Sequence, residues 1–360
     1  MKTKIMFTVF LMVTTFSLKA QQSKNTKVVL ITLDGLRWQE LFTGADPLLV
    51  ANKQYVHDTT GLKKQFWKET AAERRETLLP FFWSKVTALG QIHGNRNFGS
   101  KVNLTNKMWF SYPGYNEILT GKADDERIDS NAKINNPSKT VLEIANSDVR
   151  YKGKVAAFGS WDVFPYIINE ERSGVPVNAG FENAKGNNLT DREKLLNELQ
   201  PKVPSPWGTV RFDGFTHYYA LETMKKNHPE LVYIAYGETD DFAHDGEYDA
   251  YLKSANATDD MINEIWNFTQ QDPFYKDNTL FIITTDHGRG TQPLDTWRSH
   301  GDEVKNSGEV WMAFFGKGVS PKGEIKRNNQ LYTNMIAPTI LKAMNLKIDK
   351  QLMEAAPIKL

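Results

Sequence analysis

The sequence predicts an α/β sandwich whose mostly parallel central sheet is flanked by helices. Three short β-branched or apolar runs have the composition of buried strands: Lys27–Leu33, Leu231–Tyr236 and Thr279–Thr284. Segments with helical periodicity separate these runs, as in chains that build a parallel sheet through crossover connections. An aspartate stands at or just after the end of each run, which is the edge where an open parallel sheet binds ligands.

The remaining elements predict one domain with two insertions. The helical candidates are Arg74–Leu89, Gly114–Thr120, Asp191–Leu199, Gly214–Asn227, Thr258–Gln270 and Asn334–Met344. Residues 46–70 break this rhythm, and we expect loops and short helices there. Residues 170–208, rich in Asn, Gly and Pro, predict a partly ordered insertion over one edge of the sheet. No repeat and no long linker divides the chain, so we expect a single domain over residues 21–360.

The first twenty residues predict secretion. Lys2 and Lys4 precede the apolar run Ile5–Leu18, and Ala20 stands just before Gln21, as in a secretory signal peptide with its cleavage site. The run is short and rich in Thr and Ser for a membrane span, although an uncleaved anchor is the alternative. We therefore expect a signal peptide over residues 1–20 and a secreted or periplasmic chain.

The amino-acid composition limits which classes of partner and which metal-ligating residues we can expect. The chain has no cysteine, which excludes disulfides and restricts any metal site to His, Asp, Glu and hydroxyl ligands. Its 44 basic and 43 acidic residues leave a net charge of +1. This balance gives no electrostatic case for binding nucleic acid or a membrane surface. We expect a small-molecule substrate as the partner.

Three aspartates at the strand ends predict a cation site. Each follows one of the three predicted strands: Asp34, Asp240 and Asp286. Carboxylates that converge at one sheet edge repel one another unless a cation neutralises them. A single aspartate after a strand is ordinary turn chemistry, whereas three of them with neighbouring histidines favour metal binding.

Three histidines strengthen the metal interpretation. His244 lies four residues after Asp240, so both can occupy one face of a helix. His287 directly follows Asp286, and His300 lies within reach across a loop. We interpret these three as ligands. The other histidines are expected to be structural: His57, His93, His217 and His228.

Ser111 is the candidate nucleophile. It begins the stretch SYPGYNEIL, in which we expect a helix to start at about Pro113. Metal coordination activates a serine hydroxyl by lowering its pKa, and a helix N-terminus stabilises bound anions. The alternative role is that of a helix N-cap.

The ordered set LDG, SYPGYNEILTG, ETDDFAHDG, TTDHG and WRSHG resembles the alkaline phosphatase superfamily. Within it, the chain is most similar to the branch of nucleotide pyrophosphatase/phosphodiesterases and single-domain bacterial phosphatases. The motifs run in the family's order from residue 28 to about residue 345. The resemblance implies an alkaline-phosphatase-like fold and a metal-dependent hydrolase of phosphoric esters.

The resemblance also assigns roles to the site residues. It implies two Zn2+ ions, with other divalent metals as alternatives. One metal would be held by Asp240, His244 and His300. The second would be held by Asp34, Asp286 and His287, together with the oxygen of Ser111. Ser111 would form a covalent phospho-serine intermediate. Asn131, about twenty residues after Ser111, would hold the transferred phosphoryl group, and Asn135 is the alternative.

Departures from the family pattern indicate the substrate class. Ser111 is not followed by the arginine of the sulfatase pattern C/S-x-P-x-R, which argues against a sulfatase. The superfamily's phosphate mutases are longer and carry a large inserted domain, for which this chain has little room. Single-domain bacterial monoesterases place a lysine and an arginine where this chain has Trp161 and Val163.

The missing cationic pair slightly favours phosphodiesters over monoesters. An aromatic wall would suit the second organic group of a diester, and we expect it from Trp161, Tyr112, Tyr115 and Phe164. Replacement cations are the alternative, and they would come from Arg172, Lys152 or Lys154. An alkaline-phosphatase-like phosphomonoesterase and a non-catalytic metal-binding protein are the competing functions.

Overall fold

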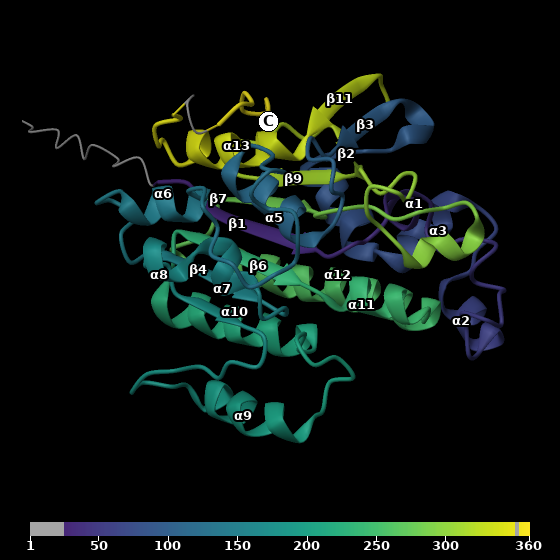
Figure 1. Cartoon of the computed structure of the whole chain (residues 1–360), viewed down its shortest axis with the longest axis horizontal. Coiled ribbons are helices and arrows are strands. Elements are labelled where there is room, and N and C mark those ends of the chain that lie inside the picture. Colours follow the sequence, from purple (N-terminus) through teal and green to yellow (C-terminus); the bar gives the residue numbers. More distant parts are fainter. Residues whose placement is uncertain (1–24, 350–352) are drawn as a thin grey trace, which may run out of the picture.

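The computed structural model describes residues 25–349 and 353–360. The fold is built around a central sheet of eight strands (Figure 1). The strand order is β10-β2-β9-β7-β1-β6-β4-β5. Their bounds are β1 Lys27–Leu33, β2 Gly90–His93, β4 Val155–Gly159, β5 Val177–Ala179, β6 Leu231–Tyr236, β7 Thr279–Thr284, β9 Met312–Gly316 and β10 Gly323–Glu324. The predicted signal peptide lies outside the described residues.

The predicted strands β1, β6 and β7 form the parallel centre of the sheet, with the bounds expected from the sequence. In register, Val28 lies opposite Leu231 and Leu280, so the three strands end at the same edge. Alternate residues of β1 enter different cores, with Val29 in one cluster and Leu30 in the other. Burial on both faces explains why these strands are almost uniformly apolar. The predicted fold class is confirmed.

Helices cover both faces of the sheet (Figure 1). One core includes residues of α10 (Asp213–Asn227) and α12 (Tyr248–Gln271). The other core includes α5 (Ser111–Thr120), α6 (Val141–Ser147), α7 (Phe164–Ile168) and α13 (Ile336–Ala343). The sheet is therefore the middle layer of a three-layer sandwich.

The other elements are short. The helices are α1 Trp38–Thr43, α2 Thr59–Phe66, α3 Ala71–Leu78, α4 Thr87–Leu89, α8 Glu170–Ser173, α9 Asp191–Leu199 and α11 Glu238–Asp245. A second sheet of three strands contains β11 Asn329–Tyr332, β3 Ser100–Asn103 and β8 Glu309–Val310. Short 3-10 turns span Arg96–Phe98, Gln200–Lys202, Leu294–Arg298 and Thr333–Met335, and a π-helical turn spans Phe82–Val86.

Two predicted helices differ from the structure. The helix expected over Arg74–Leu89 is interrupted after Leu78, next to Pro80, which has no N–H to donate within a helix. Helix α12 begins at Tyr248 instead of Thr258, because the buried face continues N-terminally through Tyr251 and Ala255. By contrast, α9 has its predicted bounds, and a capping box between Thr190 and Glu193 fixes its start.

The two predicted insertions adopt different structures. Residues 46–70 contain turns and the short helix α2, as expected. Residues 170–208 contribute β5, which pairs in parallel with β4 and forms the edge of the sheet. This stretch therefore supplies the edge strand itself as well as the segments that follow it. Helix α9 of the same stretch lies on the outer side of α10 (Figure 1).

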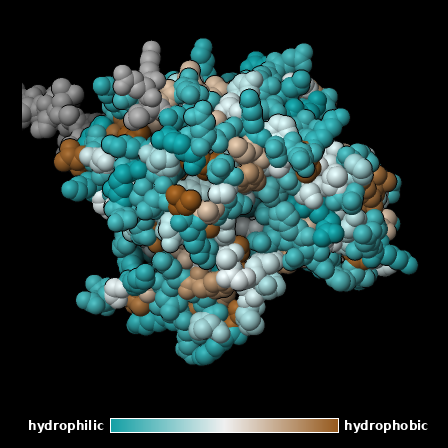
Figure 2. All heavy atoms as spheres, viewed as in Figure 1, coloured by the Kyte–Doolittle hydropathy of each residue, from teal (hydrophilic) through white to brown (hydrophobic). Residues whose placement is uncertain are grey.

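The face seen in Figure 2 is mostly hydrophilic, with hydrophobic residues in small separate groups. Among the described helices, none combines the length and the hydropathy that a membrane span requires.

Candidate metal centre

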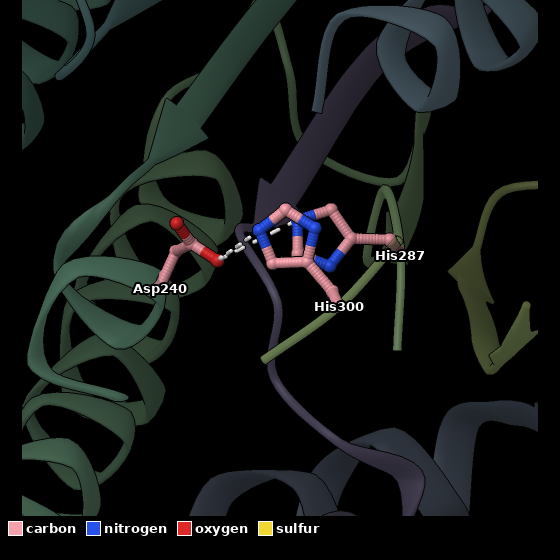
Figure 3. Close-up of side chains that lie close together, drawn as sticks. All are labelled: Asp240, His287 and His300. Atoms are coloured by element: carbon pink, nitrogen blue, oxygen red, sulfur yellow. Dashed lines mark ion pairs between the residues drawn. The ribbon is translucent and has the colours of Figure 1, made fainter. Parts of the chain in front are cut away.

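The carboxyl ends of β1, β6 and β7 bring the predicted ligands together. Asp34 directly follows β1, and Asp286 comes two residues after β7. Asp240 lies in the first turn of α11, which begins just after β6. Figure 3 shows the Asp240 carboxylate directed toward the imidazole rings of His287 and His300. The predicted ligands form two adjoining groups, which we call the inner group and the outer group.

The inner group contains Asp34, Asp286 and His287, all buried. His287 Nε2 lies 3.2 Å from Asp34 Oδ1 and 3.5 Å from Asp286 Oδ2. Both of these oxygens are buried and accept no hydrogen bond. Their partner oxygens are occupied, because Asp34 Oδ2 accepts from the Tyr115 hydroxyl at 2.7 Å and Asp286 Oδ1 accepts from Gly35 N at 3.1 Å. Each carboxylate therefore presents one free oxygen toward the same point.

The tautomer of His287 suits ligation. Its Nδ1 lies 3.0 Å from the carbonyl oxygen of Gly288, and a carbonyl can only accept. Nδ1 therefore carries the proton in the neutral ring, which leaves the lone pair on Nε2. A backbone acceptor on the far nitrogen is the usual arrangement for a metal-binding histidine.

The outer group contains Asp240, His244 and His300. His244 Nε2 lies 3.2 Å from Asp240 Oδ2 and 2.9 Å from His300 Nε2. His300 Nε2 lies 3.7 Å from Asp240 Oδ1. The His287 ring stacks on that of His300 with centroids 3.9 Å apart, so the inner and outer groups share a boundary.

The electrostatics of the centre favour a cation. Burial, reinforced by the Asp240 charge, raises the pKa of Asp34 well above its ordinary value. Burial and the charge of Asp34 raise the pKa of Asp286 in the same direction. Burial lowers the pKa of His300, so its imidazole is neutral and able to bind a metal. A divalent cation would stabilise the ionised carboxylates that burial and mutual repulsion disfavour.

Ser111 is the first residue of α5, and Phe110 is the N-cap. The helix therefore begins two residues before the expected Pro113, and the alternative role of Ser111 as an N-cap was wrong. Ser111 is buried, and its Oγ lies 3.4 Å from His287 Nε2. The helix N-terminus and the inner group thus meet at this hydroxyl.

A cavity of about 220 Å³ opens onto the centre. It is lined by Asp34, Ser111, Asn131, Trp161, Thr209, Val210, Gly237, Asp240, Asp241, His244 and His300. Trp161 pairs with Val210 through an isolated β-bridge, so both belong to one wall. None of the described residues that line the cavity is a lysine or an arginine.

Asn131 is the predicted asparagine that reaches the cavity. Its Oδ1 accepts a hydrogen bond from Tyr112 N at 3.0 Å, which fixes the side chain beside the start of α5. The alternative, Asn135, is exposed outside the cavity, with its amide 3.4 Å from Glu171. The structure therefore brings Asn131, and not Asn135, to Ser111.

The expected aromatic wall is corrected to Trp161 alone. Tyr112 is buried, and its hydroxyl donates to the carbonyl of Ile134 at 2.6 Å. Tyr115 is buried beneath the centre, where it binds Asp34. Phe164 packs edge-on against Tyr115 in the core. All three support the site from behind and do not line the cavity.

The proposed replacement cations are also absent from the cavity. Arg172 pairs with Glu143 at 2.7 Å and donates to backbone carbonyls of residues 136–138. Lys154 pairs with Glu230 at the amino end of β4, opposite the centre. Lys152 is exposed two residues earlier.

The four remaining histidines lie outside the centre. Three are at least partly buried and bonded within the fold: His93 to Gln91, His217 to Tyr236, and His228 to Asp272. His57 is exposed and pairs with Glu247 at 2.6 Å. With Glu247 and Asp249 it forms a separate surface cluster.

Sequence reasoning missed two charged residues of the centre. Asp241 lines the cavity, and burial together with the charge of Asp240 raises its pKa to about 9. Its position beside Asp240 in ETDD was the available indication. Arg289 is buried and pairs with the Asp240 carboxylate. Burial raises the pKa of Asp240, but the Arg289 charge together with His244 and His300 lowers it well below its ordinary value.

Comparison with known proteins identifies relatives by sequence. A family model described as the metalloenzyme superfamily matches residues 190–348. A 2,3-bisphosphoglycerate-independent phosphoglycerate mutase of Aliarcobacter butzleri (strain RM4018) is 29% identical over 170 residues, which is 45% of this chain and 32% of the mutase. The enzyme of Campylobacter jejuni (strain RM1221) is 30% identical over 173 residues, 46% of this chain and 32% of the mutase. The match therefore spans about a third of these relatives.

Solved structures share the fold across nearly the whole chain. The crystal structure of the alkaline phosphatase PafA has a TM-score of 0.57 at 11% identity, covering 93% of this chain and 98% of that protein. The phosphonate monoester hydrolase of Silicibacter pomeroyi has a TM-score of 0.54 at 14% identity, covering 93% of this chain and 78% of the hydrolase. The shared fold and the family match agree with the resemblance to the alkaline phosphatase superfamily that the sequence motifs indicated.

Proposed function

We propose that this chain is a two-metal hydrolase of phosphoric esters of the alkaline phosphatase superfamily, which uses Ser111 as its nucleophile and prefers phosphodiesters. The observation that carries the proposal is the position of Ser111 Oγ. It lies at the first turn of α5, 3.4 Å from His287 Nε2, in a cavity lined by ligands of both metal groups. A nucleophile, a cation site and an anion-stabilising helix end therefore meet at one point.

The donor set fits a pair of zinc ions. Two buried carboxylate oxygens without partners, Asp34 Oδ1 and Asp286 Oδ2, lie near His287 Nε2. Carboxylate and imidazole ligands without cysteine suit zinc and similar divalent ions. The inner group would hold one ion together with Ser111, and the outer group would hold the other. When bound, the ions would lower the pKa of the Ser111 hydroxyl and neutralise charge on the phosphoryl and leaving oxygens.

The chain's own residues position the reaction. A bond forms between Ser111 Oγ and phosphorus as the bond to the leaving oxygen breaks, and the serine proton is released while the departing alcohol gains one. Water then cleaves the Oγ–P bond, so the net reaction converts a diester and water into a monoester and an alcohol. The positive end of the α5 helix dipole and the Ser111 N–H would stabilise the phosphoryl oxygens, and the Asn131 amide NH2 would donate to one of them.

The uncharged cavity wall supports the preference for diesters. Trp161, Thr209 and Val210 form this wall, and no lysine or arginine lines it among the described residues. A monoester dianion carries one more charge than a diester and would place an oxygen against this wall. A missing donor at the transition state costs about 2–4 kcal/mol, a factor of about 30 to 1000 in rate.

Matched nitrophenyl substrates test the proposal. We expect kcat/KM for methyl nitrophenyl phosphate to exceed that for nitrophenyl phosphate, with nitrophenyl sulfate far behind both. A monoester advantage above about tenfold would contradict the preference and favour an alkaline-phosphatase-like monoesterase. Trp161→Lys should shift the ratio toward the monoester, because it adds a cation to the wall, whereas Trp161→Phe should leave the ratio nearly unchanged.

The mutase relatives supply a competing reaction, transfer of the phosphoryl group to a second hydroxyl. This reaction regenerates an ester, whereas hydrolysis consumes water and releases alcohol. Incubation of a monoester with a polyol acceptor in ¹⁸O-labelled water separates the two. We expect labelled inorganic phosphate, and a phosphorylated acceptor as the main product would favour transfer.

We also propose that the chain is exported through its N-terminal segment. The charged start, the apolar run and Ala20 carry this proposal. Cell fractionation followed by N-terminal sequencing should find a mature chain that begins at Gln21. A chain retained with Met1 in the cytoplasm would contradict it.

A further inference from the structure

We infer that Arg289 is a positioning residue that holds two loops of the outer group against the loop that follows Asp34 and thereby sets the affinity of the outer group for its cation. The inference rests on the proposed metal centre. It assigns a role to a residue that contacts neither the cavity nor the position of a substrate. Arg289 is 1% exposed and is among the largest fully buried side chains of the described chain.

One guanidinium connects three segments that are far apart in sequence. Arg289 Nε donates to Gly35 O at 3.2 Å, Nη1 to Arg298 O at 2.7 Å, and Nη2 to Asp240 O at 3.0 Å. Nη2 also pairs with the Asp240 carboxylate. Gly35 follows the ligand Asp34, and Arg298 precedes the ligand His300 by two residues. Each bonded segment therefore carries a predicted ligand.

A second arginine extends this connection to His244. Arg298, whose carbonyl is bound by Arg289, donates from its own Nη2 to His244 O at 2.8 Å. The backbone next to His300 is thereby tied both to Asp240 and to His244. All three ligands of the outer group are linked through the two guanidinium groups.

The inner group shares only one contact with Arg289, at Gly35, whose carbonyl accepts from the guanidinium and whose N–H supports Asp286. Asp34 is held by the Tyr115 hydroxyl, Asp286 by Gly35 N, and His287 by the carbonyl of Gly288. None of these bonds involves the guanidinium. Loss of Arg289 should therefore affect the outer group much more than the inner group.

The geometry requires arginine in particular. A planar guanidinium offers five donors in a fixed fork, whereas a lysine ammonium is a compact charge that cannot reach three divergent carbonyls. The contact is also tight: Gly35 has φ +59°, and a Cβ there would lie 2.8 Å from Asp240 Oδ1 and 2.9 Å from Arg289 Nε. Glycine at this position lets the first loop approach the guanidinium.

Metal binding to three variants tests the inference. Arg289→Gln and Arg289→Lys change the guanidinium, and Arg74→Gln is the matched control. Arg74 is also buried and donates to three carbonyls, those of Thr43, Lys68 and Glu69, but it lies in α3 and none of these partners belongs to the centre. Chelator competition on metal-free protein would give the number of zinc equivalents and the affinity of each.

We expect two tight equivalents in the wild type and in Arg74→Gln, even if the control melts earlier. In Arg289→Gln one equivalent should remain tight, and the other should bind at least 30-fold more weakly. The remaining equivalent should match that of His244→Ala, which removes an outer ligand directly. Arg289→Lys should behave like Arg289→Gln, because the fork and not the charge alone connects the loops.

Several outcomes would overturn the inference: unchanged or tighter binding of both equivalents in Arg289→Gln, equal loss of both, or wild-type binding in Arg289→Lys. If Arg289→Gln does not fold, Arg289→Lys carries the same test, since it keeps the charge and most of the volume. A wild-type chain that binds no metal would refute the proposed function itself. Two sites that do not respond to Arg289 would refute only its positioning role.

Discussion

The variant Tyr115→Phe tests whether Tyr115 of α5 supports the metal centre or contacts the substrate directly. Tyr115 is fully buried, and its hydroxyl donates to Asp34 Oδ2 at 2.7 Å. This bond lowers the pKa of Asp34 against the effect of burial, so its loss makes the ionised carboxylate harder to form. A hydrogen bond to a charged group is worth about 1.5–3 kcal/mol.

The expected effect is a loss of metal affinity. If the whole free energy of this hydrogen bond is lost from zinc binding at the inner group, zinc should bind about 10- to 100-fold more weakly. This is the range typical for removal of a residue that supports a metal ligand. KM for a diester should stay nearly constant at saturating zinc, because the Tyr115 ring does not line the cavity. Chelator competition and steady-state kinetics at several zinc concentrations would measure the two effects.

Tyr112→Phe is the matched control. Its hydroxyl is also bound within the protein, but to the carbonyl of Ile134 at 2.6 Å and not to a ligand of the centre. We expect a small loss of stability, about 0.5–1.5 kcal/mol, with unchanged zinc affinity. Unchanged zinc affinity in Tyr115→Phe together with a raised KM would refute the reasoning and restore the tyrosine to the substrate wall.

Three further predictions follow from the site and the core. Ser111→Ala should keep the fold and two metal equivalents while lowering turnover by several orders of magnitude, whereas Ser111→Thr should retain part of the wild-type turnover. Near wild-type turnover in the alanine variant would place the nucleophile elsewhere. Asp286→Ala should lose both the metal of the inner group and the activity, because it removes a buried candidate ligand. Metal analysis and an activity assay would measure the two, and an active variant with full metal content would exclude Asp286 as a ligand. Asp259 is buried where it accepts the backbone N–H groups of Phe81 and Phe82, and burial raises its pKa to about 7. Between about pH 4 and pH 7 the folded chain keeps a proton on Asp259 that the unfolded chain has released. The contribution of Asp259 to the free energy of unfolding is therefore complete below about pH 4 and is lost as the pH rises through 7. Asp259→Asn should flatten the pH dependence of urea unfolding over this window by up to about 4 kcal/mol, and an unchanged slope would contradict the shift.

Local pattern was sufficient to predict the central strands and the positions of the candidate metal ligands. Strands β1, β6 and β7 are buried on both faces, so their apolar runs end where the strands end. Parallel pairing then requires the residues that follow them to share an edge. Asp34, Asp240 and Asp286 were predictable for this reason, without knowledge of any loop.

Side-chain direction was not predictable in the same way. Tyr112 and Tyr115 lie next to Ser111 in sequence, but helix α5 turns both rings into the core beneath the site. Trp161 reaches the cavity because it follows β4 and pairs with Val210, a residue from a distant loop. Arg289 had no recognisable pattern at all, since its partners are carbonyls of three loops that only the fold brings together.

The central claim is that two metal ions and Ser111 act together on a phosphoric ester. Zinc titration of metal-free protein, followed by the rate of diester hydrolysis, tests it most directly. We predict almost no hydrolysis in the metal-free wild type, full activity only as the second zinc equivalent binds, and no recovery in Ser111→Ala although it binds the same two equivalents. Full activity without metal, or maximal activity at one equivalent, would contradict the claim.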